Sequence, residues 1–238
     1  MAIVRYAVLN DVHFPYEGNC YFKALKEIKK WKDLAGIYFN GDILEVESLS
    51  RHPKGPSAIS SFQHEVEYAN GRFDDLEKMF KGVPVTLVEG NHCYRLFRYI
   101  RDVAPALWGL LNHPELLEFD RRGWKFEPYG PRQWVKCGKS KLWLRHEPLG
   151  GGQYPTKITA EKSDVDVLFG HTHIYQQYVC KKHGPKIRHV KAYSGGWLGD
   201  IKQPVFDYRG AKDNWCEGFS EIKCETRTGE YEYRFHYL

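Results

Sequence analysis

Residues 3–13 read IVRYAVLNDVH, an apolar run that ends directly in an asparagine, an aspartate and a histidine. Runs of the same kind occur at residues 35–39, 83–88, 142–144 and 165–169, each followed by polar residues that include Asp, Asn or His. Their length and residue types predict strands that are buried on both faces. Such strands are typical of sheets covered by helices, which bind ligands at the carboxyl ends of their strands. We therefore expect an α/β fold with functional residues at the strand ends.

Segments between these runs have helical periodicity. Apolar side chains recur every three to four residues over residues 22–31 and 59–80, and a third apolar and basic segment follows Asn91. From about residue 124 onward, strand-like runs separated by turns replace the alternation of strands and helices. No repeat, low-complexity tract or linker divides the chain, so we expect a single domain over residues 1–238.

Composition excludes several classes of protein. The 238 residues are 42% hydrophobic and 27% charged, which is typical of a folded globular protein. No stretch reaches the roughly 18 consecutive apolar residues of a membrane span, and the N-terminal segment lacks the pattern of a secretory signal. The six cysteines have no C-x-x-C spacing, so we expect reduced thiols and a cytoplasmic location. The net charge of +5 favours anionic partners without identifying one.

Five groups of metal-binding residue types stand at the ends of the predicted strands. They are Asp11-Val12-His13, Gly41-Asp42, Gly90-Asn91-His92, His146 and Gly170-His171-Thr172-His173. Two residues at i and i+2 just past a strand point the same way, so a D-x-H or H-x-H pair is expected to converge on one ion. Asp42 stands alone between two such groups, and its two oxygens can bridge a pair of ions. Carboxylate, amide and imidazole ligands without thiolate favour Mn, with Fe or Zn as alternatives, in an open catalytic site.

The order of these motifs resembles the signature of the calcineurin-like metallophosphoesterases, namely D-x-H, G-D, G-N-H, a single His and G-H-x-H. The resemblance covers the chain from Asp11 to His173. It implies a four-layer αββα fold, with two mixed sheets packed face to face, helices outside, and two metal ions at one edge. By position it gives Asp11, His13 and His173 to the first ion, Asn91, His146 and His171 to the second, and Asp42 to both. His92 is then the histidine that contacts the scissile phosphate or protonates the leaving group.

Two positions differ from the usual pattern of this family. Cys93 follows the G-N-H histidine where many relatives have Asp or Glu, so no adjacent carboxylate orients His92. His146 is followed by Glu147 and Pro148, where a glycine is common. The sequence therefore leaves the partner of His92 unassigned.

The chemistry of such a site is consistent with phosphoester hydrolysis. Two divalent cations roughly 3.5–4 Å apart hold phosphate oxygens, and a water that bridges them is hydroxide near neutral pH. The leaving alkoxide then needs a proton, which a histidine with a pKa near 6.5 can supply. We therefore expect His92 to be the catalytic residue beside the metal ligands.

Positive charge gathers in two stretches of the second half. Residues 121–141 hold seven Lys or Arg and one acid, with tryptophans among them, and residues 181–191 add further Lys and Arg without an acid. Basic side chains interleaved with aromatic ones are typical of single-stranded nucleic acid binding. Edge strands that are protected by lysine have the same composition, and the sequence does not separate the two interpretations.

Two arginines are candidates for substrate binding. Arg95 follows the G-N-H motif closely and is placed to bind phosphate, although Arg98 and Arg101 at the same spacing are also typical of a solvated basic helix face. Arg51 lies in a turn-rich segment, residues 46–57, that follows Asp42 and is expected to form the rim of the substrate cleft.

The sequence supports three hypotheses for function. The first is a two-metal phosphodiesterase or nuclease that acts on nucleic acid or nucleotides, with basic residues binding the flanking phosphates. The second is a phosphomonoesterase that acts on a protein or a small metabolite. The third is an inactive scaffold, which the complete set of ligand residues disfavours.

Overall fold

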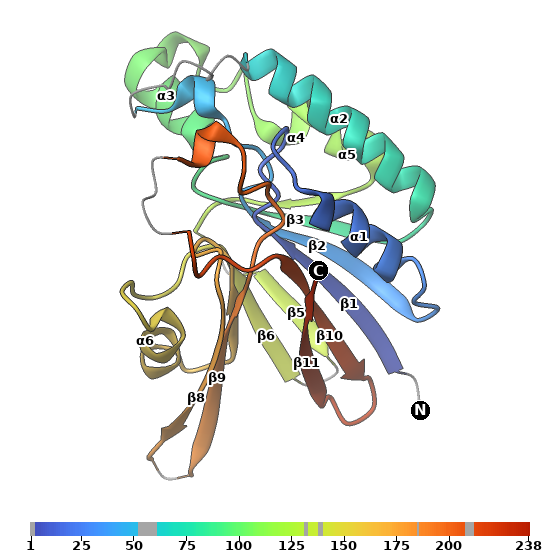
Figure 1. Ribbon diagram of the computed structural model, residues 1–238, viewed down its shortest axis with the longest axis vertical. Coiled ribbons are helices and arrows are strands. Elements are labelled where there is room, and N and C mark those ends of the chain that lie inside the picture. Colours follow the sequence, from blue (N-terminus) through green and yellow to red (C-terminus); the bar gives the residue numbers. More distant parts are fainter. Residues whose placement is uncertain (1–2, 52–60, 131–132, 138–139, 185, 208–211) are drawn as a thin grey trace.

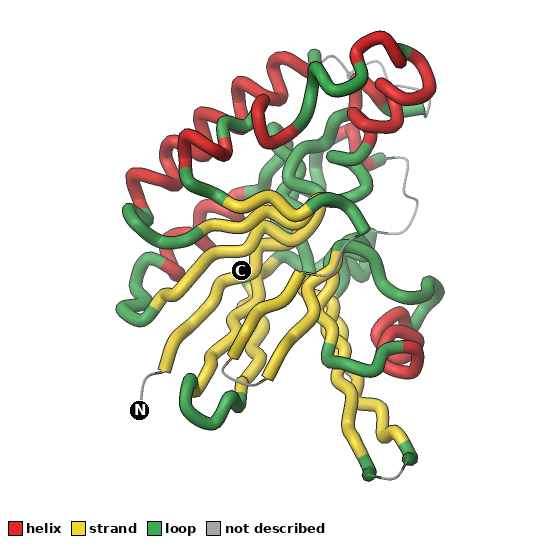
Figure 2. Tube along the Cα trace, turned by 180° about the vertical axis from the view of Figure 1, so that it is seen from behind, coloured by secondary structure: helices red, strands yellow, loops and turns green. Residues whose placement is uncertain are grey.

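The computed structural model describes residues 3–51, 61–130, 133–137, 140–184, 186–207 and 212–238, which form two β-sheets packed against each other (Figure 1, Figure 2). The first sheet has the strand order β11-β10-β1-β2-β3-β4 and the second β5-β6-β7-β9-β8. The strands of the first are β1 (Ile3–Asn10), β2 (Leu34–Gly41), β3 (Val85–Glu89), β4 (Lys125–Glu127), β10 (Gly218–Glu225) and β11 (Tyr231–Tyr237). Those of the second are β5 (Gln133–Cys137), β6 (Ser140–Arg145), β7 (Val167–Phe169), β8 (Tyr175–Lys182) and β9 (Arg188–Gly195).

Helices cover the outer faces of both sheets. α1 (Asn19–Ile28) and α2 (Phe62–Met79) lie on the first sheet, and α6 (Pro155–Lys162) packs against β8 and β9 of the second (Figure 1). The connections contain α3 (Arg95–Val103), α4 (His113–Leu116), α5 (Phe119–Arg122) and the 3-10 turns η1 (Glu47–Leu49), η2 (Pro105–Leu107) and η3 (Pro204–Phe206). This is the four-layer αββα arrangement that was expected. Among the described residues, no helix has the length and apolar character needed to cross a membrane.

Burial on both faces explains the continuous apolar runs. On β1, Ala7 and Leu9 belong to the core under the helices, whereas Val8 between them belongs to the core between the two sheets. On β3, Leu87 and Val88 divide in the same way. Each fully buried aliphatic side chain stabilises the fold by about 1.5–3 kcal/mol. A polar substitution in these runs would therefore destabilise the fold, whichever face of the sheet the side chain is on.

The long helix α2 begins with a side-chain cap and buries one face. Ser61 accepts a hydrogen bond from the backbone N–H of His64, which satisfies a free donor of the first turn. Phe73 and Leu76 are fully buried against the first sheet. The first residues of the predicted helix and the end of the predicted cleft rim fall in residues 52–60, which lie outside the described residues.

Strand direction brings the polar strand ends together. β1, β2 and β3 are parallel to one another, as are β6, β7 and β9, so each set presents its carboxyl ends at one edge of its sheet. Two buried asparagines join these edges, because Asn40 Nδ2 donates to Asn10 Oδ1 at 2.9 Å and to the Arg145 carbonyl at 3.1 Å. Asn10 Nδ2 donates in turn to the carbonyl of Gly195 at 3.0 Å. These bonds align the strand ends of the two sheets.

The cysteines are only partly as expected. Cys20, Cys93, Cys180 and Cys216 are free thiols. Cys224 on β10 is in a disulfide, so the expectation that all six cysteines are reduced is wrong. Spacing along the chain could not reveal this, because a disulfide depends on which Cβ atoms the fold brings within about 4.5 Å.

Candidate metal centre

The five motif groups meet at the edge where the strand ends of both sheets adjoin. Two glycines of these motif groups lie so close to ligand side chains that no other residue would fit. A Cβ atom on Gly41, whose φ is +113°, would lie 2.0 Å from Nδ1 of His146, and one on Gly90 would lie 2.1 Å from Oδ1 of Asp42. Only glycine, which has no side chain, permits these contacts. The glycines thus set how closely the loops after β2 and β3 approach the ligand residues.

Four side chains from both sheets form one tight cluster. The carbonyl oxygen Oδ1 of Asn91 lies 2.7 Å from His146 Nε2 and 2.9 Å from His171 Nδ1. His146 Nε2 lies 3.3 Å from His171 Nδ1 and 3.1 Å from Asp42 Oδ2. Two oxygens and two nitrogens therefore face a common point, as the ligands of a single cation do.

Three further side chains form a second cluster beside the first. Asp11, His13 and His173 each offer a ligand atom, and these atoms lie within 4.8 Å of one another. The nearest pair is His13 Nε2 and His173 Nε2, 3.3 Å apart. Asp42 also forms a group with His13 and His92, so it lies between the two clusters, where a bridging carboxylate is expected.

The local geometry of the H-x-H motif differs from the simple expectation. Asp11 and His13 share one cluster, but His171 joins the first cluster and His173 the second. All four residues have positive φ, from 48° at Asp11 to 64° at His171. The backbone past β1 and β7 is therefore left-handed at alternate residues and not extended, so the rule for extended chains does not apply there. A non-glycine residue in this conformation is strained, and such strain is typical of functional sites.

The donor atoms fit a pair of divalent cations. A backbone N–H fixes one oxygen of each aspartate, since His171 N donates to Asp11 Oδ2 and His92 N to Asp42 Oδ1, both at 2.8 Å. The other oxygen of Asp11, Oδ1, is buried and accepts no hydrogen bond from the described residues. A buried carboxylate oxygen without a donor is unfavourable, and a cation would satisfy it.

The buried groups also shift each other's protonation. Burial raises the pKa of Asp11 to about 6, and the imidazole of His146 partly offsets this shift. Burial alone would raise the pKa of Asp42, but His146 and His92 outweigh it and hold that pKa well below 3.8. Burial would lower the pKa of His146, yet Asp42 and Asp11 raise it to about 9. Shifts of opposite sign in one buried cluster are typical of functional sites.

Glu45, three residues after Asp42, supplies the carboxylate that Cys93 does not. Its Oε2 lies 2.7 Å from Nδ1 of His13, and its Oε1 lies 3.0 Å from Nδ1 of His92. Its side chain is 2% exposed, and His92 and His13 hold its pKa below the ordinary value against the effect of burial. Carboxylates that bind the second nitrogen of a ligand histidine fix its orientation and raise its basicity. Cys93 is buried instead, and its sulfur accepts a hydrogen bond from Leu44 N at 3.4 Å.

His92 lies next to the clusters with a defined tautomer. Arg95 donates from its guanidinium to His92 Nε2 at 3.0 Å, so Nε2 is the acceptor and Nδ1 carries the proton towards Glu45. Nε2 is 3.9 Å from Asp42 Oδ2. Burial lowers the pKa of His92, although Glu45 and Asp42 oppose this shift.

Aromatic side chains from the C-terminal part of the chain enclose the second cluster. Trp197 stacks on His173 with ring centres 4.7 Å apart, and Trp215 meets the same imidazole edge-on at 4.4 Å. Phe206 lies edge-on to His13 at 5.4 Å. No motif marks these residues in the sequence. They exclude water from one side of the clusters and restrict the rotation of the imidazoles.

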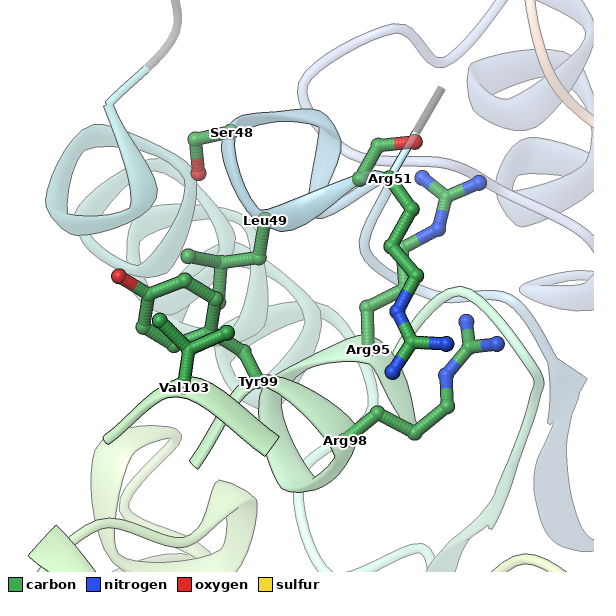
Figure 3. A pocket seen from close by; sticks show the side chains of 8 residues that line it. Ser48, Leu49, Arg51, Arg95, Arg98, Tyr99 and Val103 are labelled. Carbon is green, nitrogen blue, oxygen red and sulfur yellow. The ribbon is translucent and has the colours of Figure 1, made fainter. Parts of the chain in front are cut away.

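Two pockets adjoin the clusters. The first, here called the arginine pocket, is a cavity of about 340 Å³ lined by Leu49, Arg51, Arg95, Arg98, Tyr99 and Val103 (Figure 3). Arg95 connects it to His92. Arg51 is mostly exposed and pairs with Asp102. The two arginines that were expected to bind substrate thus line one cavity, whereas Arg101 does not line it.

The second pocket, here called the aromatic pocket, lies on the side of α6. It has a volume of about 740 Å³ and is lined by Tyr154, His171, Tyr175, Gln176, Asn214 and Trp215, among others. His171 connects it to the first cluster, and its walls combine aromatic rings with amide groups. The clusters are thus linked to this pocket by His171 and to the arginine pocket by His92 and Arg95.

The basic stretch in the β8–β9 hairpin lies away from the clusters. In the β8–β9 hairpin, Lys182 and Arg188 are opposite each other in the strand register. Arg188 stands seven residues before Gly195 on β9, so the backbones of these two residues are roughly 20 Å apart. Arg121 and Arg122 pair with Asp74 of α2 at 2.9 and 2.7 Å. Residues 131–132 and 138–139 of the other stretch lie outside the described residues. The number of charges in the sequence could not show that Arg121 and Arg122 pair with an acid, or that the hairpin is distant from the clusters.

Similarity to known proteins agrees with this geometry. The sequence profile of the family named calcineurin-like phosphoesterase matches residues 4–175. The Gene 54 protein of Mycobacterium phage D29 is 27% identical, with 90% of this chain and 87% of the relative covered. The Gene 54 protein of Mycobacterium phage L5 is 25% identical, with 91% and 87% covered.

Solved structures of another protein align with this chain at low sequence identity. Vacuolar Protein Sorting 29 from Cryptosporidium parvum aligns over 100% of this chain and 99% of its own, at 13% identity and a TM-score of 0.49. The protein of the same name from Chaetomium thermophilum aligns over 100% and 97%, at 9% identity and a TM-score of 0.48. The family profile covers well over half of the chain, including every motif group described above. This chain therefore belongs to the calcineurin-like phosphoesterase family, and it is a metal-dependent phosphoester hydrolase.

Proposed function

We propose that this hydrolase cleaves phosphodiesters in nucleotides or nucleic acid. The supporting observation is that two pockets connect to the clusters, one through Arg95 and His92 and the other through His171. A diester carries a substituent on each side of phosphorus, whereas a monoester carries one. The aromatic walls of one pocket suit a base, and the arginines of the other suit an anionic group. The remote β8–β9 hairpin is not part of this proposal.

We assign the metal ligands as the geometry groups them. Asp11, His13 and His173 would hold one divalent cation, Asn91, His146 and His171 would hold the other, and Asp42 would be available to both. When bound, the cations supply a hydroxide nucleophile and neutralise charge on the phosphate. Oxygen and nitrogen donors without thiolate favour Mn²⁺, with Fe²⁺ or Zn²⁺ as alternatives.

His92 and Arg95 act on the substrate as a pair. A phosphate oxygen bound by the guanidinium of Arg95 lies beside His92 Nε2, because the two groups are 3.0 Å apart. The negative charge of that phosphate favours protonation of His92, and Glu45 keeps the Nδ1 proton in place. Nε2 takes up a proton from water, and this proton is then available to the leaving oxygen. The phosphate replaces His92 as the acceptor for Arg95.

A comparison of two chromogenic esters tests the proposal. Metal-free protein is loaded with Mn²⁺, Fe²⁺ or Zn²⁺, and hydrolysis of bis-p-nitrophenyl phosphate is measured against p-nitrophenyl phosphate. We expect the diester to have the higher kcat/KM and Mn²⁺ to give the highest rate. Asp42→Ala, which removes the bridging carboxylate, should abolish both activities. Preferential cleavage of the monoester would instead identify a phosphomonoesterase.

A further inference from the structure

Arg98 carries the least compensated charge in the arginine pocket. Arg95 is held by Glu45, whose Oε1 lies 3.1 Å away and whose backbone carbonyl accepts at 2.7 Å. Arg51 pairs with Asp102. Within the described part of the chain, no acidic side chain pairs with Arg98, which is half-buried. The pocket therefore attracts an anion beyond the one that Arg95 can reach.

The pocket has two chemically different walls. Figure 3 shows the guanidinium groups of Arg51, Arg95 and Arg98 gathered on one side, with Tyr99 and Leu49 on the other. Guanidinium groups bind phosphate through paired N–H donors, and an aromatic ring offers a stacking surface for a base. A cavity of about 340 Å³ lies at the lower end of the range for small-ligand sites. A nucleotide unit combines both features that the walls require.

Resting on the proposed diesterase function, we propose that the arginine pocket binds a second phosphate of the substrate, carried by the nucleotide unit next to the scissile diester. His92 Nε2 lies 3.9 Å from Asp42 Oδ2 and 3.0 Å from the guanidinium of Arg95. Arg95 is therefore close enough to Asp42 to contact the scissile phosphate. Arg98 lies one helical turn further along α3 and, with Arg51, faces the next phosphate. The base or sugar of that unit lies against Tyr99 and Leu49.

Two esters that differ only in the second phosphate test this proposal. The p-nitrophenyl ester of thymidine 5′-phosphate is compared with the same ester carrying a 3′-phosphate, using Mn²⁺-loaded protein. We expect the 3′-phosphate to raise kcat/KM by about tenfold or more, the effect of one or two charge-assisted hydrogen bonds. Arg98→Ala should reduce this preference to about one, and Arg98→Lys should restore part of it.

Arg101→Ala is the matched control, because Arg101 is on the same helix and does not line the pocket. It should keep the full preference for the 3′-phosphate. Equal kcat/KM for the two esters in the unsubstituted protein, or an undiminished preference in Arg98→Ala, would overturn the proposal.

A binding measurement separates this proposal from the diesterase function. If the metal-loaded protein cleaves neither ester, the diesterase proposal fails, and calorimetry with thymidine 3′,5′-bisphosphate and metal-free protein then tests the pocket alone. Affinity should fall about tenfold in Arg98→Ala and stay unchanged in Arg101→Ala. Equal affinity in all three proteins would show that the pocket does not bind the second phosphate.

Discussion

Replacing Glu45 with glutamine removes a negative charge from the middle of the site and keeps the shape of the side chain. The carboxylate lies 2.7 Å from His13 Nδ1, 3.0 Å from His92 Nδ1 and 3.1 Å from Arg95. Glutamine has one acceptor oxygen and an NH₂ donor, so it can accept from only one of the two imidazoles. A hydrogen bond to a charged group contributes about 1.5–3 kcal/mol, so the substitution removes about that much of the free energy that fixes the orientation of one histidine.

We expect Glu45→Gln to weaken the binding of the cation assigned to Asp11, His13 and His173 by about 10–100-fold, the usual effect of losing a carboxylate behind a ligand histidine. Titration of metal-free protein with Mn²⁺ in competition with a fluorescent chelator measures this change. Glu17→Gln is the control, since Glu17 is equally buried at 2% exposed but binds Arg72 and Tyr68 outside the site. Both variants should lose stability, and only Glu45→Gln should lose metal affinity. Unchanged Mn²⁺ affinity in Glu45→Gln, or equal weakening in both, would refute the reasoning.

Three further substitutions probe the loops, the proton donor and a buried acid. Gly90→Ala should abolish binding of the bridged metal pair, measured as metal content, because its Cβ would lie 2.1 Å from Asp42 Oδ1. His92→Asn should keep both metal ions and lower kcat for the diester by about 10²–10⁴. Glu65→Gln should remove a pH dependence of stability, since burial raises the pKa of Glu65 to about 8. The folded state then keeps a proton that the unfolded state releases above pH 4.5, so stability falls by up to about 1.4 kcal/mol per pH unit between pH 4.5 and 8.

Each of these variants has a control or a contrary outcome. Gly71→Ala on α2, where an added Cβ meets nothing within 4 Å, should keep the metal ions. Loss of metal in His92→Asn would make His92 a ligand and not the donor. For Glu65→Gln, urea denaturation at several pH values is compared with Glu67→Gln, an exposed acid on the same helix. A pH slope in Glu65→Gln equal to that of the parent protein would contradict the role of the buried proton.

Several features of the fold were predictable because they depend on local sequence. The apolar runs before Asp11, Asp42 and Asn91 are strands buried on both faces, and this burial leaves few alternatives to a covered sheet. The motif residues meet at one edge because parallel strands end together. The four-layer fold followed from a resemblance and not from periodicity, which does not specify how two sheets pack.

Other features of the site depend on contacts between distant segments. Glu45 stands three residues after Asp42, and its acidic type was visible, but its contact with His92 depends on where the loop after β3 lies. Trp197 and Trp215 come from a region without motifs. His171 and His173 join different clusters, whereas Asp11 and His13, which have the same left-handed φ, share one, so spacing along the chain does not decide which residues meet.

The proposed ligands come from both sheets. Asp11, His13, Asp42 and Asn91 follow strands of the first sheet, whereas His146, His171 and His173 follow strands of the second. A cation held by both groups is a non-covalent cross-link, so its affinity and the association of the sheets are thermodynamically coupled. Above the dissociation constant, each tenfold increase in the free metal concentration would add about 1.4 kcal/mol to the free energy of unfolding. A substitution that loosens the Tyr193–Tyr233 contact, where the rings stack at 4.0 Å between the layers, would then reduce metal occupancy without touching a ligand.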